Sequence, residues 1–292
     1  HEQDVLCAAV SRDGARTFTA SADGTVKIWN SAARPPRVLS TSEIQLPGTL
    51  RVCVLSPDRA RVLASATGVA WILPLAGDGA TIPLFGHRGE IRHAAFDSSA
   101  QRIVTASDDR SAMIWSADGA DEPVVLRGHE GSVYYASFSP DGAQVVTASW
   151  DGTARIWDAR GGPARVVLRG HEKPVRSASF SHDATRIVTA SDDGSARIWS
   201  ANGTGDIVTL YGHKAAVLHA VFSADDQRVV TGSRDGTARV WRVNFDDANL
   251  LQSRIRATTS VCVPAEQREF LLGEPIEQAE RRYRECERSA GR

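Results

Sequence analysis

Residues 129–158 read HEGSVYYASFSPDGAQVVTASWDGTARIWD and contain short β-prone runs separated by turn signals. The runs are 133–138, 144–149 and 153–157, and a fourth follows at 164–168. The Ser-Pro-Asp-Gly turn at 139–142 ends the first run, and Asp151-Gly152 is the tight-turn signal of a hairpin. Runs of about five residues without helical periodicity predict a four-stranded antiparallel sheet.

The same pattern returns along the chain with a period of 42 residues. The period is shown by Trp115, Trp157, Trp199 and Trp241, and by Gly-His pairs at 86–87, 128–129, 170–171 and 212–213. Each of these histidines stands 28 residues before its tryptophan, as from 129 to 157, and His1 stands 28 residues before Trp29. We therefore expect the glycine of the first pair to precede His1 in a longer protein. A repeat of about 40–45 residues with these marks is typical of a propeller blade.

The residues of this unit also resemble a known family. Gly128-His129, Ser149, Asp151-Gly152 and Trp157-Asp158 are similar to the WD repeat, and similar sets recur in five of six units over residues 1 to about 245. The resemblance implies an all-β fold, a WD-repeat β-propeller with six recognisable blades whose inner strands end near residues 29, 73, 115, 157, 199 and 241. Seven blades is the usual family number, and an unclosed ring exposes a sheet edge. We therefore expect at least one more blade upstream in the parent protein, and whether these six units close as a ring stays open.

Five units contain His, Ser and Asp, which is also the composition of a hydrolase triad. A catalytic site needs one such set, whereas a repeated fold needs one per blade. A loop histidine can bond a strand hydroxyl and the turn aspartate, and such a buried network stabilises a blade when every member is satisfied. The resemblance identifies the sets as structural tetrads: His1/Ser21/Asp23/Trp29, His87/Ser107/Asp109/Trp115, His129/Ser149/Asp151/Trp157, His171/Ser191/Asp193/Trp199 and His213/Ser233/Asp235/Trp241.

Two units depart from this pattern. The second has no Gly-His pair, and an alignment of Ser65 on Ser149 places Leu73 at the tetrad tryptophan, so we expect this blade to be the least rigid. The third has Asp109-Arg110 in place of Asp-Gly, which predicts a strained hairpin turn or a turn of another type.

Residues 246–292 form a mostly helical tail outside the repeat. Helical stretches are expected near 246–255, after Pro264 and after Pro275, and a β-like run at 259–263 is a candidate outer strand for the sixth blade. We interpret the tail as a cap on the propeller, with a partner-binding helix as the alternative. Its sequence TTSVCVPAEQREFLLGEPIEQAERRYRECER also resembles the C-terminal ends of large bacterial signalling proteins, in which WD propellers follow a kinase, a STAND-type NTPase or a caspase-like domain.

Composition argues against several kinds of partner. The 34 basic and 35 acidic residues nearly cancel, so the chain has no global field that would attract nucleic acid or an anionic membrane surface. No stretch approaches the roughly 20 apolar residues that a bilayer crossing needs. We therefore expect neither a nucleic-acid nor a membrane partner.

The cysteines and the scattered histidines show no site pattern. Cys7, Cys53, Cys262 and Cys286 form neither a disulfide framework nor a metal motif, so we expect reduced thiols in a cytoplasmic protein. His93, His182 and His219 lack a matching metal set, and structural or exposed histidines are expected there. No phosphate-binding glycine loop, HExxH or CxxC motif is present, and neither metal nor cofactor is predicted.

The resemblance implies three partner-binding positions per blade, two on the first strand and one before the turn aspartate. In chain order they are Asp4, Leu6, Ala22; Thr49, Arg51, Ala66; Glu90, Arg92, Asp108; Ser132, Tyr134, Trp150; Pro174, Arg176, Asp192; and Ala216, Leu218, Arg234. Tryptophan, tyrosine and arginine are enriched in binding hot spots, which favours Trp150, Tyr134, Arg176 and Arg92, with Arg234, Arg51 and Leu218 as further members. Arginines beside an aromatic ring favour a protein or peptide with acidic groups.

The sequence thus favours a non-catalytic protein-interaction or sensor module, the regulatory end of a larger bacterial signalling protein. Other domains of the same parent chain are possible partners. One alternative is an enzyme that uses the channel mouth, with Asp4, Glu90, Asp108 and Asp192 as candidate acids spread over four blades. Another is a rigid spacer in a larger assembly.

Overall fold

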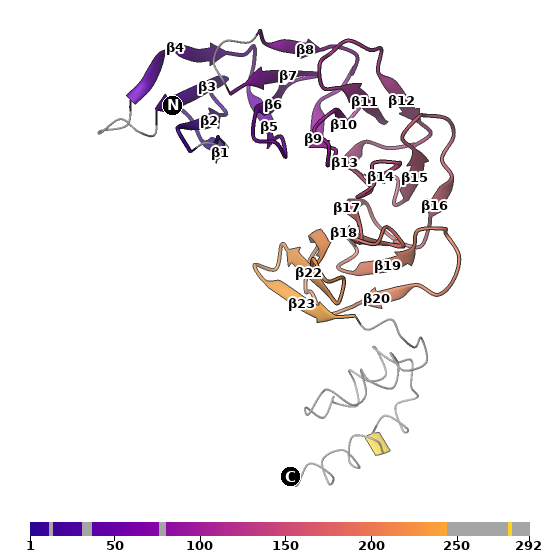
Figure 1. Ribbon diagram of the computed structural model, residues 1–292. Coiled ribbons are helices and arrows are strands. Elements are labelled where there is room, and N and C mark those ends of the chain that lie inside the picture. The colour runs from indigo at the N-terminus through magenta and orange to yellow at the C-terminus, as the bar shows by residue number, and fades with distance from the viewer. Residues whose placement is uncertain (12–13, 31–36, 76–79, 244–279, 282–292) are drawn as a thin grey trace. The chain divides into compact units, whose positions relative to one another are not determined.

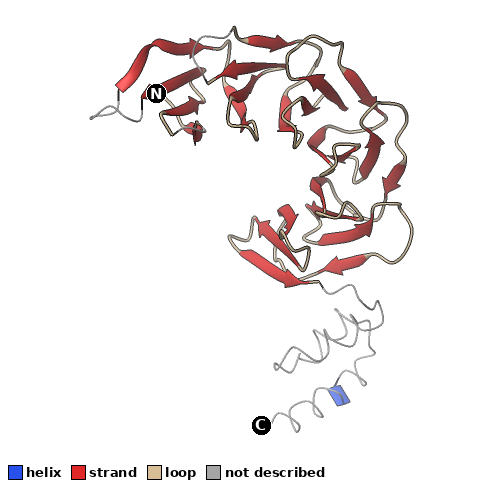
Figure 2. Ribbon diagram, in the orientation of Figure 1, coloured by secondary structure: helices blue, strands red, loops and turns tan. Residues whose placement is uncertain are grey.

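The computed structural model describes residues 1–11, 14–30, 37–75, 80–243 and 280–281. The chain divides into two units, His1–Trp241 and Arg242–Arg292. The sheets lie in the first unit, apart from Arg242, the last residue of the final strand. The helical stretches and the strand predicted within 246–279 lie outside the described residues. Of the tail, Glu280 and Arg281 are described, and both are helical (Figure 2).

Six antiparallel sheets make up the first unit, and Figure 1 follows them in chain order. The first two sheets are β1 (Val5–Val10), β2 (Arg16–Ser21), β3 (Thr25–Asn30), β4 (Arg37–Gln45) and β5 (Leu50–Leu55), β6 (Arg61–Ala66), β7 (Val69–Pro74), β8 (Ile82–Leu84). The next two are β9 (Ile91–Phe96), β10 (Arg102–Ser107), β11 (Ser111–Ser116), β12 (Val124–Arg127) and β13 (Val133–Phe138), β14 (Gln144–Ser149), β15 (Ala154–Asp158), β16 (Val166–Leu168). The last two are β17 (Val175–Phe180), β18 (Arg186–Ser191), β19 (Ala196–Ser200), β20 (Val208–Leu210) and β21 (Val217–Phe222), β22 (Arg228–Ser233), β23 (Ala238–Arg242).

The strand register repeats with the sequence. Val145 of β14 pairs with Trp157 of β15, and Ile187 pairs with Trp199 in the same way one repeat later. In the five regular sheets the hairpin between the second and third strands closes at the turn that the repeat predicts. The third strands contain or end beside residues 29, 73, 115, 157, 199 and 241, so the prediction of six blades is confirmed.

Successive sheets pack face to face. The first strands lie side by side in the order β1, β5, β9, β13, β17 and β21. We call the face of a sheet that contacts the following sheet its trailing face, and the face that contacts the preceding sheet its leading face. Between the fourth and fifth sheets the core consists of Val146, Ala148, Ala154, Ile156 and Leu168 on the trailing face and Val175, Ala178, Phe180, Ile187 and Trp199 on the leading face.

This packing explains the composition of the second strands. A strand such as Gln144–Ser149 is covered on both faces, and every residue after Gln144 is buried. Such a strand lacks the alternation of apolar and polar residues seen in half-buried strands and reads as a continuous run of small and β-branched residues.

A disulfide bond joins the first two sheets. It links Cys7 of β1 to Cys53 of β5, whose Cα atoms lie 6.1 Å apart. The prediction of reduced thiols is therefore wrong for these two cysteines, because their spacing in the sequence does not reveal that β1 and β5 lie side by side. Cys262 and Cys286 lie outside the described residues.

Candidate partner-binding face

A chain of buried hydrogen bonds ties each regular sheet together. In the fourth sheet the Trp157 indole N–H donates to Thr147 Oγ1 at 2.9 Å, and Thr147 Oγ1 lies 2.7 Å from His129 Nε2. His129 Nδ1 lies 2.7 Å from an Asp151 carboxylate oxygen. Because Asp151 accepts at Nδ1–H, the Nε2 lone pair faces the threonine, so the chain runs from Trp through Thr and His to Asp.

Threonine, and not the predicted serine, is the hydroxyl at the centre of this chain. The threonines are Thr19, Thr105, Thr147, Thr189 and Thr231. Ser149 instead donates to the Gly131 carbonyl at 3.1 Å and accepts from the Asp151 backbone N–H at 3.1 Å. The predicted tetrads are therefore corrected at one member: Ser21, Ser107, Ser149, Ser191 and Ser233 hold the hairpin turn beside the tetrad.

The first sheet closes its network through an additional threonine. His1 Nδ1 lies 2.6 Å from Thr25 Oγ1 and 3.5 Å from Asp23, and Thr25 donates to Asp23 at 2.6 Å. In the other four sets the histidine and aspartate lie 2.7–2.9 Å apart. All five predicted histidine–aspartate pairs are thus brought together.

Hydrogen bonding controls the titration of these groups. Burial alone would raise the pKa of Asp151, but bonds from His129 and Thr153 outweigh it and hold that pKa well below its usual range. Burial lowers the pKa of His129, although Asp151 opposes the change. The buried histidine is therefore neutral at pH 7, as its role as an acceptor requires.

The second sheet replaces the whole network by apolar packing. The pairs Val62–Leu73 and Ala64–Trp71 stand where Val145–Trp157 and Thr147–Arg155 stand in the fourth sheet. Leu73 therefore occupies the tryptophan position, as predicted.

The serine of the predicted alignment is one residue out of place. Ala66 pairs with Leu50 as Ser149 pairs with Val133, so Ala66 and not Ser65 holds the serine position. The hairpin of this sheet is shorter than the others, which shifts the alignment by one residue. The displaced Ser65 hydroxyl is buried without a hydrogen-bond partner.

The hairpin turn of the third sheet keeps the usual geometry despite its arginine. The Arg110 N–H donates to Ser107 C=O at 3.2 Å, as Gly152 donates to Ser149. Arg110 has a φ of 69°, close to the 79° of Gly152. The turn is therefore of the same kind, with a side chain in a conformation that favours glycine.

Two of the three predicted partner-binding positions are hydrogen-bonded to each other in five of the six sheets. The residue before the turn aspartate donates its backbone N–H to the first of the two positions on the first strand, as Trp150 does to Ser132 at 2.9 Å and Asp192 to Pro174 at 3.0 Å. In the second sheet Ala66 is buried at the serine position and is no part of such a group.

Three of the predicted side chains, from two neighbouring sheets, lie in contact. The Tyr134 and Trp150 rings lie edge to face with centroids 5.8 Å apart. The Arg176 guanidinium of the next sheet lies 4.6 Å from the Tyr134 ring centroid and 5.8 Å from that of Trp150. We call Tyr134, Trp150 and Arg176 the aromatic patch. Trp150 is 55% exposed, the largest exposure of any tryptophan in the described residues.

Carboxylates of the same face neutralise its arginines. Arg176 Nε and Nη2 donate to the two Asp192 oxygens at 2.8 and 2.5 Å. Arg92 donates to Asp108 at 2.9 and 2.5 Å, and its Nη1 lies 3.1 Å from Glu90. Both arginines are therefore already paired with carboxylates of the same face, which weighs against the acidic partner that the sequence favours.

Sequence reasoning missed these pairs, although a signal was present. Arg92 and Asp108, like Arg176 and Asp192, are separated by the same 16 residues as Tyr134 and Trp150. The spacing places a first-strand residue beside a turn residue of its own sheet.

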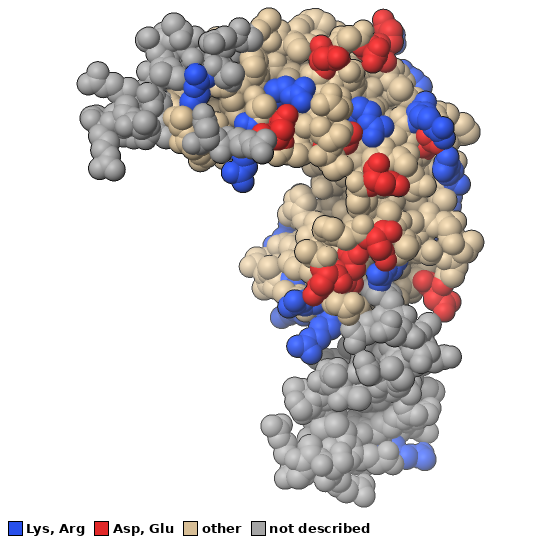
Figure 3. Space-filling view, in the orientation of Figure 1, with Lys and Arg blue, Asp and Glu red and all other residues tan. Residues whose placement is uncertain are grey.

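The remaining predicted members lie away from the aromatic patch. Arg51 of β5 pairs with Glu90 of the third sheet at 3.1 Å, which extends the charged network across two sheets. In the sixth sheet Arg234 is exposed and Leu218 is partly buried. Among the described residues, no hydrogen bond, ion pair or ring contact joins either of these two side chains to the patch. Figure 3 shows acidic and basic groups interspersed over the face in view.

A comparison with protein families decides the classification. The family described as "WD domain, G-beta repeat" matches at residues 1–30, 80–116, 122–158, 162–200 and 205–242. The chain belongs to the WD-repeat family. Chains of this family are typically non-catalytic scaffolds for protein–protein interaction, and their partners are typically proteins or peptides. A comparison with curated proteins finds no significant match.

The WD-repeat matches leave out residues 31–79, which include the first three strands of the second blade, β5 to β7. That blade nevertheless forms a four-stranded sheet, β5 to β8. Apolar packing therefore suffices to hold this blade together without the residues that mark a WD repeat.

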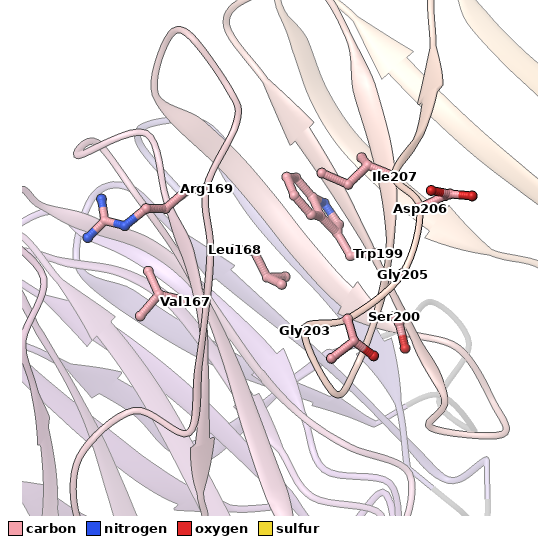
Figure 4. Close-up of a pocket in the computed structure, with 10 residues that line it drawn as sticks. Val167, Leu168, Arg169, Trp199, Ser200, Gly203, Gly205, Asp206 and Ile207 are labelled. Carbon is pink, nitrogen blue, oxygen red and sulfur yellow. The ribbon is translucent and has the colours of Figure 1, made fainter.

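Other sites in these WD-repeat blades are weaker candidates. A pocket of about 170 Å³ lies between the end of β16 and the 203–207 loop, lined by Leu168, Arg169 and Trp199 (Figure 4). It is smaller than the roughly 300–1,000 Å³ of most ligand pockets. Among the described residues, no group of three His, Cys, Asp or Glu is placed to hold a metal, and no helix is long and apolar enough to cross a membrane.

His93 has a structural role between two blades. His182 and His219, in contrast, are exposed. The His93 ring stacks on Tyr135 of the next blade at 3.8 Å, and its Nδ1–H donates to the Ala136 carbonyl at 3.1 Å. Desolvation by this packing lowers the pKa of His93 to about 4.

Stability is expected to fall as the pH drops from 6.5 toward 4, partly because of His93. The unfolded chain binds a proton near the ordinary histidine pKa of about 6.5, whereas folded His93 binds it only near 4, so its contribution is complete above pH 6.5 and lost in this range. The contribution is roughly 2 kcal/mol after allowance for partial exposure. Urea unfolding of a His93→Phe variant at pH 7 and pH 4.5 should show a smaller pH dependence than the parent. His182→Gln, at an exposed position, should leave the dependence unchanged, and equal slopes for all three proteins would contradict the assignment.

Proposed function

We propose that this chain is a non-catalytic protein-interaction module that holds its partner at the aromatic patch. The proposal is carried by Trp150, which is more than half exposed and yet fixed in position. Its backbone is bonded to Ser132, and its ring is supported by Tyr134 and Arg176. An aromatic side chain that is ordered before binding contributes affinity at low conformational cost.

The charge pattern of the face supports a partner with an apolar or aromatic contact group. Arg176, Arg92 and Arg51 already bond to Asp192, Asp108 and Glu90, so an acidic partner would have to compete with these carboxylates at those arginines. The same pairs argue against the enzyme alternative, because three of its four candidate acids are already engaged with arginines. A neutral group packed against Trp150 meets no such competition.

We further propose that the module serves as the regulatory end of a larger bacterial signalling protein that acts in the cytoplasm. Support comes from the resemblance of the tail sequence to the ends of such proteins. The balanced charge of the chain also fits a protein partner better than nucleic acid or a membrane.

Substitution of Trp150 by alanine should abolish partner capture. Loss of a central tryptophan costs about 2 kcal/mol or more in binding, which lowers the affinity by about 30-fold. The test is affinity capture from an extract of the native cell, with captured proteins quantified for the parent chain and the Trp150→Ala variant. The melting temperature should stay nearly unchanged, because the ring is exposed.

Val125→Ala is the matched control, since Val125 is also an exposed apolar residue but lies on the outer strand β12. Capture by this variant should equal that of the parent chain. If Trp150→Ala captures the same proteins at the same level, the patch is not the binding site. Absence of any captured protein with the parent chain would favour a rigid spacer.

A further inference from the structure

Several arginines on or beside the two outer strands of the third, fourth and fifth sheets have no acidic partner. Two of them are exposed, one at the end of β12 and one directly after β16, and the other two hold the same position on β15 and β19. In the part of the chain that the structure describes, no hydrogen bond or ion pair engages their guanidinium groups. We call them the arginine row: Arg127, Arg155, Arg169 and Arg197.

The fold holds Arg155 and Arg197 against the backbone of a glycine. A Cβ atom at Gly128 would lie 2.8 Å from Arg155 Nη1, and one at Gly170 would lie 2.7 Å from Arg197 Nη1. The glycine of each Gly-His pair therefore leaves the space that the guanidinium fills. The Nε of both arginines is buried without an acceptor. A partly buried cation without a counterion costs free energy, which an added anion can offset.

Two members of the row lie on the same face of the fourth sheet. Arg155 of β15 pairs with Val167 of β16, and Arg169 stands two residues after Val167, so the three side chains lie on one side of the sheet. Figure 4 shows Val167 and Arg169 pointing the same way, with Leu168 between them turned in the opposite direction. The outer part of this face is therefore positively charged.

The glycines extend the row to the neighbouring sheets. Arg169 directly precedes Gly170, the glycine against which Arg197 of the fifth sheet packs. Arg127 of the third sheet and Arg155 of the fourth stand in the same relation one junction earlier. The row therefore crosses two junctions between sheets.

The charge of the row acts on two histidines of the tetrads. Burial is the main cause of the low pKa of His129, and the charge of Arg155 lowers that pKa further. Burial likewise lowers the pKa of His87, and the charge of Arg127 adds to the effect. An arginine paired with a carboxylate would have a much smaller effect, because the two opposite charges nearly cancel at a distance. The positive charge of the row is therefore uncompensated.

We propose that the arginine row binds an extended acidic segment of a partner protein. A guanidinium donates two parallel hydrogen bonds to a carboxylate, and a row over three sheets requires several carboxylates in succession. At the aromatic patch and beside it, Arg176 and Arg92 already bond to Asp192 and Asp108, so an acidic segment meets less competition at the row. The balanced charge of the whole chain favours a peptide over nucleic acid, which needs a wider positive field. The row shares no residue with the aromatic patch, and this inference does not rest on the proposed function.

Fluorescence anisotropy of the full chain with a labelled glutamate decapeptide tests the proposal. The glutamate peptide should bind and a glutamine decapeptide should not, and added salt should weaken the binding. Arg169→Gln should lower the affinity by about fivefold, the effect of one exposed ion pair. Arg127→Glu combined with Arg169→Glu should abolish binding. Both side chains are exposed, so an unchanged melting temperature should accompany the loss.

Arg165→Gln is the matched control for Arg169→Gln. Arg165 is also an exposed arginine beside β16, but it bonds to Asp158, so its loss removes the same charge without removing a free guanidinium. This variant should bind the glutamate peptide as the parent chain does. Trp150→Ala should do so as well, which separates this proposal from the proposed function.

Three outcomes would overturn the proposal. The first is a parent chain that binds neither decapeptide, or binds both equally. The second is an equal loss of affinity in Arg165→Gln and Arg169→Gln, which would indicate a general effect of charge. The third is tighter binding of a single-stranded oligonucleotide of equal charge, which would identify nucleic acid as the ligand.

Discussion

Replacement of Thr147 by valine is expected to lower the free energy of unfolding by about 4 kcal/mol, because two buried polar groups lose their partner at once. The Trp157 N–H and the His129 Nε2 both depend on this hydroxyl, at 2.9 and 2.7 Å. Each buried unsatisfied group costs about 1–3 kcal/mol, whereas the shape of the side chain is unchanged. Urea unfolding and the melting temperature measure the loss.

Ser149→Ala is the matched control for the threonine. Ser149 is equally buried but bonds only to backbone groups of its own hairpin, so its loss should cost about 1 kcal/mol. Addition of His129→Phe to Thr147→Val should cost less than the sum of the two single changes, because the orphaned acceptor is then removed. Equal losses for Thr147→Val and Ser149→Ala would show that threonine is not the centre of the network.

Reduction of the Cys7–Cys53 disulfide is expected to lower the free energy of unfolding by about 4 kcal/mol. The bond closes a loop between residues 46 positions apart, and the restriction that it places on the unfolded chain scales with the length of that loop. Chemical denaturation with and without a thiol reductant measures the change. A Cys7→Ser, Cys53→Ser double variant should match the reduced parent chain and show no further response to the reductant.

The disulfide also bears on the expected cytoplasmic location, since such bonds are rare in that compartment. Trapping of free thiols in intact cells would show which form is present where the protein works. If the reductant leaves the stability of the parent chain unchanged, the bond does not contribute to the fold.

Most of the fold follows from the 42-residue pattern, but the identity of the hydroxyl in the tetrad does not. Thr147 and Ser149 are two residues apart on one strand, so both point to the same face and both can bond a histidine. Which of the two hydroxyls bonds the histidine depends on the register between the first and second strands. Ser149 pairs with Val133 beside the bulge and is taken up by the turn, which leaves Thr147 opposite the histidine.

The sequence predicted the members of the aromatic patch, but it did not predict that the arginine of the patch pairs with a carboxylate. Trp150, Tyr134 and Arg176 follow from their positions in the repeat, and the structure places them in contact. The pairing of Arg176 with Asp192 requires that both side chains turn toward each other and away from solvent. The link between Cys7 and Cys53 depends on contact between sheets, which a repeat within each sheet does not specify.

For a partner that binds at the proposed face, we expect the carboxylate-paired arginines Arg92 and Arg176 to determine how fast it associates. A face with unpaired positive charge accelerates encounter with an acidic protein by long-range attraction, up to about 10⁸–10⁹ M⁻¹s⁻¹. Arg92 and Arg176 are already matched by Asp108 and Asp192, so they exert little pull at a distance. We therefore expect association with such a partner at the unsteered rate of about 10⁵–10⁶ M⁻¹s⁻¹, almost insensitive to ionic strength. We therefore expect differences in the dissociation rate to determine which partner is retained.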